Sequence, residues 1–179
     1  MISRLPFIAS LISALVLSAC GGSVINGTIH RAGVVDHFAA SGGRDLMTVI
    51  VGNPFAQPKT VVDETVVAAM QGHHMGARSR FTTTPDASAI PIYRIAIVFD
   101  PARTTDSAAV CRNAPRIGAT KTDGLRLLAA FCADDLPLTS VEAMIPTRAD
   151  RADDPAVLRL IADVVRELIP SEDPLAYID

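Results

Sequence analysis

The sequence predicts a small α+β domain in which two helices cover one face of an antiparallel sheet of about four strands. Three observations predict it. Runs of β-branched and aromatic residues are bounded by Gly and Pro, and two other segments carry apolar residues at helical spacing. The two kinds of segment follow one another along the chain in the order strand, strand, helix, strand, strand, helix.

The first two strands are predicted to form a β-hairpin. Residues 34–40 and 44–51 are rich in β-branched and aromatic side chains, and the turn signal Ser41-Gly42-Gly43 separates them. Pro54 and Pro58 follow the second run and end it, because proline cannot donate a hydrogen bond to a neighbouring strand.

Two helices are predicted from apolar periodicity. The first spans residues 60–71 and ends before Gly72. The second follows Asp153 or Asp154, either of which suits the N-cap, with Pro155 in the first turn. Its apolar face consists of Leu158, Ile161, Ala162, Val165 and Leu168.

The other two strands are predicted at residues 90–99 and 125–133. The first is almost entirely made of β-formers and stops at Asp100-Pro101. The second is a candidate for a buried strand, although its Leu and Ala residues would also suit a helix.

The N-terminus has the pattern of a secretory signal, predicted to be removed as residues 1–19. Arg4 supplies a positive charge, residues 5–17 are almost wholly apolar, and small residues follow. The apolar run is shorter than the roughly 20 residues that span a bilayer, so a permanent transmembrane helix is the less favoured interpretation.

The segment Leu17-Ser18-Ala19-Cys20 resembles the bacterial lipobox. The resemblance implies a diacylglycerol on the Cys20 thiol, cleavage before Cys20, and a third acyl chain, such as palmitate, on the new N-terminus. Several chains on one residue give a lasting membrane anchor. Gly21 is not the aspartate that retains such lipoproteins in the inner membrane, so the resemblance favours the outer membrane, with the protein facing the periplasm. An ordinary signal peptide that contains a cysteine is the alternative.

Cleavage would leave residues 20–33 as a lipidated N-terminus and tether, and residues 34–179 as a single domain. Loss of Arg4 changes the formal net charge from −3 to −4, and no long charged run is present. This composition argues against nucleic acid as a partner. The partners that we expect are the membrane, through Cys20, and an envelope protein.

Two cysteines remain after Cys20 is set aside. Cys111 and Cys132 form the only other pair, and an exported protein lies in a compartment where disulfides persist. A disulfide between them is predicted. A reactive thiol or a metal site is the alternative, but neither cysteine belongs to a CxxC motif or has a His close by in the sequence.

Several short segments resemble an uncharacterised group of proteobacterial lipoproteins. They are residues 52–55, 93–101, Cys111 and 129–132, and the resemblance extends over residues 44–170. It implies no activity and no catalytic residues, and it supports pairing of the two cysteines.

A segment rich in His and Met is the candidate metal site. Its possible ligands are Met70, His73, His74 and Met75. Imidazole and thioether groups suit copper, and imidazole also suits zinc; His30 and His37 would be further donors. The alternative is that these His residues stabilise the C-terminus of the helix that precedes them, and on that interpretation the protein holds no cofactor.

Asn53 and Phe55 are candidate binding residues in the segment Gly52-Asn53-Pro54-Phe55. The alternative is a turn that ends a strand, with Phe55 packed in the core. No catalytic residues are predicted, because the chain contains no GxSxG elbow, Walker loop or HExxH motif.

The function that the sequence favours is therefore a non-enzymatic, membrane-anchored binding or assembly module of the envelope. The alternative is a periplasmic copper-binding lipoprotein that uses His73 and His74, and a hydrolytic role is the least favoured.

Overall fold

The computed structural model describes residues 23–118 and 124–172, so the predicted signal peptide and Cys20 lie outside the described residues. The strands are β1 (Val24–His30), β2 (Asp45–Val51), β3 (Arg80–Thr82), β4 (Tyr93–Phe99), β5 (Leu125–Ala133) and β6 (Leu136–Ile145). The helices are α1 (Val34–Ala40), α2 (Lys59–Met70), α3 (Ser107–Cys111) and α4 (Pro155–Leu168).

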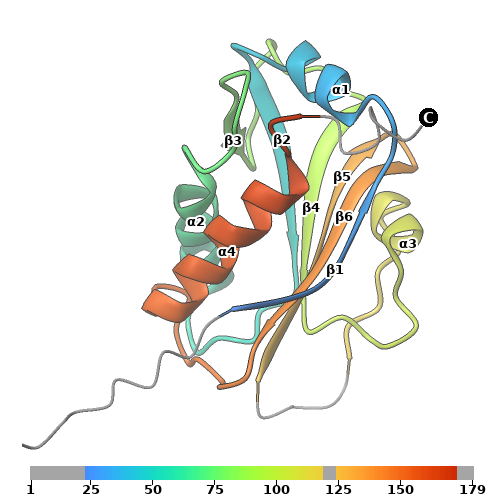
Figure 1. Ribbon diagram of the computed structural model, residues 1–179. Helices are drawn as coiled ribbons and strands as arrows, with labels where there is room; N and C mark the ends of the chain where they lie inside the picture. Colours follow the sequence, from blue (N-terminus) through green and yellow to red (C-terminus); the bar gives the residue numbers. More distant parts are fainter. Residues whose placement is uncertain (1–22, 119–123, 173–179) are drawn as a thin grey trace, which may run out of the picture.

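The six strands form one mixed sheet in the order β1-β6-β5-β4-β2-β3 (Figure 1). The pairs β1–β6, β6–β5 and β5–β4 are antiparallel, whereas β4–β2 and β2–β3 are parallel. The α+β class is as predicted. The sheet differs from the prediction in its six strands, in their order and in its parallel part.

The two faces of the sheet are covered unequally. Helices α2 and α4 lie next to each other on one face, and the much shorter α3 lies on the opposite face, against β5 and β6 (Figure 1). The main hydrophobic core fills the layer under α2 and α4, and a small second cluster that includes Val98, Val110 and Leu128 lies under α3. The α3 side therefore leaves more of the sheet uncovered.

Local sequence explains the two long helices. In α2, Val62, Val66 and Met70 recur every fourth residue and are fully buried. Helix α4 begins as predicted: the Asp154 carboxylate accepts a hydrogen bond from the Ala156 amide at 2.8 Å, and Pro155 occupies the first turn.

The predicted hairpin is wrong in its first strand, because residues 34–40 form α1 rather than a strand. Val34 and Phe38 are four residues apart, and both are buried. The Phe38 ring packs edge-on against Phe131 of β5, with 6.0 Å between the ring centroids. Burial of this helical face outweighs the β propensity of the segment.

Four other elements differ from the sequence-based prediction. Residues 24–30, placed in the tether, form β1 along β6. Strand β6 and helix α3 were not predicted, because their apolar residues follow neither a clear alternation nor a long helical period. Strand β3 was not predicted because its three residues are too few to show a pattern. Among the residues that the structure describes, no helix is long and apolar enough to cross a membrane.

Candidate functional site

A pocket of about 300 Å³ opens on the α3 side of the sheet. Its floor and one wall come from β5, β6 and β1, through Leu128, Ser140, Glu142, Gly27 and Ile29. Its other wall is the segment 103–107, which leads into α3. The volume is at the lower end of what small-molecule sites occupy.

The wall at residues 103–107 is held by a set of short hydrogen bonds. The Thr105 hydroxyl donates to the Arg116 carbonyl at 2.8 Å and accepts from the Arg116 amide at 3.1 Å. The Asp106 carboxylate caps α3 by accepting from the Ala109 amide at 2.7 Å. The loop is therefore fixed before any ligand enters.

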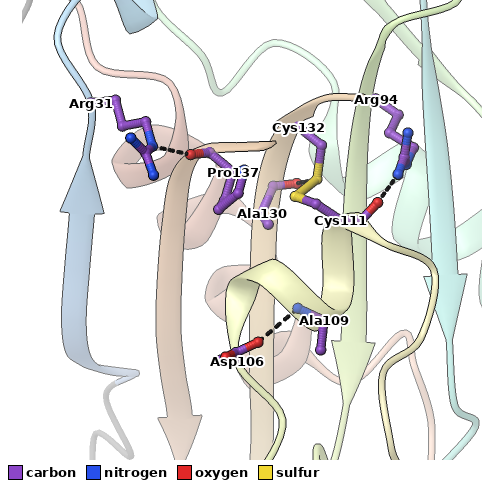
Figure 2. Close-up of a disulfide and its surroundings, with 8 residues drawn as sticks. All are labelled: Arg31, Arg94, Asp106, Ala109, Cys111, Ala130, Cys132 and Pro137. Atoms are coloured by element: carbon purple, nitrogen blue, oxygen red, sulfur yellow. Dashed lines mark hydrogen bonds between the residues drawn. A yellow bond between two sulfur atoms is a disulfide. The ribbon is translucent and has the colours of Figure 1, made fainter. Parts of the chain in front are cut away.

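A disulfide fastens the other end of α3 to the sheet. Cys111, the last residue of α3, is joined to Cys132 of β5, with 5.6 Å between their Cα atoms (Figure 2). Arg94 of β4 donates a hydrogen bond to the Cys111 carbonyl beside it. The predicted disulfide is thus present in the structure, and it holds the end of α3, the helix that follows the pocket wall, against β5.

Two charged side chains line the pocket without an ion pair or hydrogen bond among the described residues. They are Arg103, on the loop, and Glu142, on β6, and both are exposed. Ser140 beside them is buried. The pocket thus offers one cation, the carboxylate of Glu142, the Asp106 carboxylate that caps α3, several hydroxyl groups and an apolar floor to a ligand.

Gly27 opens the pocket on the β1 side. It pairs with Glu142 in the β1–β6 register, and a Cβ atom added to it would meet no atom within 4 Å. Any other residue here would extend a side chain into empty space beside Glu142. The absence of a side chain at position 27 is therefore part of the shape of the pocket.

The candidate metal ligands lie in different environments. Met70 is fully buried at the end of α2, whereas Met75 is 59 % exposed. The His74 ring lies edge-on to Phe38 and Phe81, and its Nε2 donates to the Ala77 carbonyl at 3.1 Å. His73 is half-buried in the adjoining loop. In the described parts of the chain, no group of three or more His, Cys, Asp or Glu side chains is placed to hold a metal ion.

The two further candidate donors, His30 and His37, lie on other elements than the loop that contains His73 and His74. His30 is the last residue of β1, and His37 lies in α1, where its Nδ1 hydrogen-bonds to the Tyr93 hydroxyl at 2.9 Å.

Asn53 and Phe55 form a turn at the end of β2. The Asn53 side chain accepts from the Phe55 amide at 3.1 Å and donates to the Gln57 carbonyl at 2.8 Å. Phe55 is buried and packs edge-on against Phe99. Gly52 has φ +84°, and a Cβ there would lie 2.9 Å from the Phe99 carbonyl oxygen, which explains the glycine. The segment thus forms the turn with a packed Phe55 that the alternative describes, and binding by Asn53 and Phe55 stays a prediction.

The pocket residues were not predicted from the sequence. They come from segments that are far apart in the chain and carry no local motif. The only signal was Gly27 within the run Val24-Ile25-Asn26-Gly27-Thr28-Ile29, because an isolated glycine in a strand often marks close approach or a bulge. The β1–β6 register does shift between Ile25 and Gly27.

Comparisons of the chain with models of protein families, with curated proteins and with solved structures found no match.

Proposed function

We propose that this protein is a non-enzymatic binding module, anchored to the envelope membrane through Cys20, which binds an extended segment of an envelope protein along β1. The observation that carries the proposal is that, in the described part of the chain, one side of β1 is unpaired. It is an edge of the sheet formed by the described residues, and only β6 pairs with it. Addition of a strand to such an edge is a common mode of peptide recognition.

The backbone geometry identifies the groups that a partner would meet. The Arg31 amide donates to the Leu138 carbonyl at 2.8 Å, and the register continues with Ile29 opposite Ser140. Along an antiparallel strand, the backbone amide and carbonyl groups of successive residues point alternately toward the paired strand and away from it. The Thr28 amide and carbonyl therefore point away from β6, toward the open edge.

The side chains of β1 do not protect this edge. Ile29 is 66 % exposed and Val24 is 49 % exposed. The strand contains no Lys, Arg, Asp, Glu or Pro, which are the residues that commonly prevent edge-to-edge pairing. An extended partner with apolar residues beside Ile29 and Val24 would satisfy both the backbone groups and the apolar surface.

The test is photo-crosslinking in intact cells from a crosslinking residue at Ile29, with Glu167, exposed on α4, as the control position. We expect a specific adduct from position 29 and none from position 167. Failure to recover an adduct specific to position 29 would contradict the proposal.

A pair of substitutions then tests the backbone contact itself. Thr28→Pro removes the outward amide, and Thr28→Val changes the same side chain but keeps that amide. Loss of one hydrogen bond of about 1 kcal/mol corresponds to roughly fivefold weaker binding. We expect Thr28→Pro to lower the yield of the adduct by at least that factor and Thr28→Val to leave it unchanged. Equal yields from two folded variants would overturn strand addition.

A further inference from the structure

We propose that the pocket between β1, β6 and the 103–107 loop binds a small zwitterion of the α-amino acid class. This proposal goes beyond the binding of a protein segment at the β1 edge and does not depend on it. The pocket faces the α3 side of the sheet, whereas the outward-pointing backbone amide and carbonyl of Thr28 lie at the edge formed by β1.

The chemistry of the lining points to a ligand with both charges. Three of the described charged residues line the cavity, and the Asp106 carboxylate already accepts from the Ala109 amide. Arg103 and Glu142 have no charged or hydrogen-bonding partner within the described ranges 23–118 and 124–172. A guanidinium binds a carboxylate with two parallel hydrogen bonds, and a carboxylate accepts hydrogen bonds from an ammonium group. A ligand with a carboxylate for Arg103 and an ammonium group for Glu142 would match both.

The rest of the cavity suits a short apolar substituent. Leu128 forms part of the floor and Ile29 part of the rim. Buried Ser140 lies two residues before Glu142 on β6, and the two residues line the same face of the sheet. A volume of about 300 Å³ accommodates an amino acid with an aliphatic side chain and some water.

The walls are in place before binding. The disulfide Cys111–Cys132 fixes one end of α3, and the Thr105–Arg116 hydrogen bonds fix the loop at the other end. A rigid site loses less entropy when the ligand binds, so that modest contacts suffice for measurable affinity.

Gly27 provides a substitution that fills the pocket without disturbing the fold. Its added Cβ would meet nothing within 4 Å, and its φ is outside the left-handed region. Valine favours strands. Gly27→Val should therefore fold and place two methyl groups in the space beside Glu142. Thr28→Val is the matched control, because it adds the same residue to the adjoining position, whose side chain faces the α4 side of the sheet.

The experiment is an NMR titration of the full mature chain with Cys20→Ser, so that the protein is not acylated. The probes are L-leucine, 3-methylbutylamine, which lacks the carboxylate, and 4-methylpentanoate, which lacks the amine. We expect saturable shifts of the Gly27, Ser140 and Glu142 amides with leucine below roughly 10 mM, and at least about tenfold weaker binding of both analogues.

The variants assign the contacts. Gly27→Val should abolish the leucine shifts and Thr28→Val should retain them. Glu142→Gln should weaken the binding of leucine about tenfold but leave the binding of 4-methylpentanoate unchanged. Arg103→Gln should also weaken the binding of leucine about tenfold but leave the binding of 3-methylbutylamine unchanged. The proposal is overturned if leucine causes no saturable shift, if either analogue binds as tightly as leucine, or if Gly27→Val titrates like the wild type. Strand addition is judged separately by the crosslinking of Thr28→Pro.

Discussion

His74 lies among aromatic rings, and this position decides how it responds to acid. The ring centroids of Phe38 and Phe81 are 5.2 Å and 5.1 Å from that of His74, and both contacts are edge-to-face. Burial, more than the nearby charge of His73, lowers the pKa of His74 below its ordinary value of 6.5, although the Ala77 carbonyl opposes this. The folded protein therefore favours the neutral ring.

Stability should fall in acid because of this residue. The pKa of His74 is lower in the folded chain than in the unfolded chain, so its contribution to stability is complete above pH 6.5 and is lost as the pH falls through the folded value. Urea unfolding at several pH values between about 7.5 and 5 should show a smaller loss of stability in His74→Phe than in the wild type. His73→Gln serves as the control: it removes only the smaller effect of the His73 charge and should keep most of the wild-type dependence. Identical pH profiles for His74→Phe and the wild type would refute this role.

Asp45 is a buried carboxylate at the start of β2, with 4 % of its surface exposed. It accepts hydrogen bonds from the Arg80 guanidinium, at 2.8 Å for Nε, and from the Asp86 amide at 2.9 Å. We expect Asp45→Ala to lower the free energy of unfolding by about 2–3 kcal/mol, because the Asp86 amide loses its acceptor while the exposed Arg80 regains water. Asp63→Ala, which breaks the Lys59–Asp63 pair on α2, should cost less than about 1 kcal/mol. Denaturant titration compares them, and equal costs would contradict this assignment.

At the level of elements, the disulfide determines how firmly α3 is held. Cys111 and Cys132 are 21 residues apart in the chain. A crosslink that closes a loop of this size stabilises a protein by roughly 3 kcal/mol in the chain-entropy model. We expect the double variant Cys111→Ala/Cys132→Ala to unfold at a correspondingly lower denaturant concentration and its α3 amides to exchange faster. The α4 amides are the internal reference. Unchanged protection of α3 relative to α4 would show that the disulfide does not hold this helix.

The elements that were predicted correctly are those whose burial pattern is simple. In α2 and α4 one face is buried, and β4 and β5 lie inside the sheet, so their runs of apolar residues are long. Helix α1 was mistaken for a strand because Val34 and Phe38 have high β propensity, and the helix is favoured by the burial of both side chains in the core.

Strand β1 and the pocket were missed for a related reason. Asn26 and Gly27 lower the strand propensity of their segment, and β1 is formed only because β6 pairs with it. The pocket depends on the same pairing, which brings Gly27 beside Glu142. The cysteine pair, in contrast, was predictable because the predicted lipobox sets Cys20 aside and leaves a single possible partner for each remaining cysteine.

For the whole molecule, the main consequence of β1 is that the folded domain begins only a few residues after Cys20 in the sequence. Ser23 already donates a hydrogen bond to the Asp163 carboxylate of α4. The three residue steps from Cys20 to Ser23 span at most about 11 Å. With Cys20 acylated, as proposed, the start of β1 would lie close to the membrane surface, and the expected tether of residues 20–33 would be much shorter.

This arrangement predicts a difference between two labelled positions. A spin label at Val24, next to Ser23, should be accessible to a relaxation agent held at the lipid surface, whereas a label at Ala39 on α1, beyond the far end of β1, should be much less so. Both residues are exposed, which makes the sites comparable. Equal accessibility in lipid vesicles would show that the domain is not held by its first strand near the membrane.

The central claim is that β1 is an open edge that a partner strand covers. Hydrogen exchange at the Thr28 amide, measured on the isolated mature protein and on the protein in envelope membranes, tests it most directly. We predict rapid exchange at Thr28 in the isolated protein, with Ile29 protected by its bond to β6, and strong protection of Thr28 in the membranes. Protection of Thr28 in the isolated protein, or rapid exchange at Thr28 in both states, would contradict the claim.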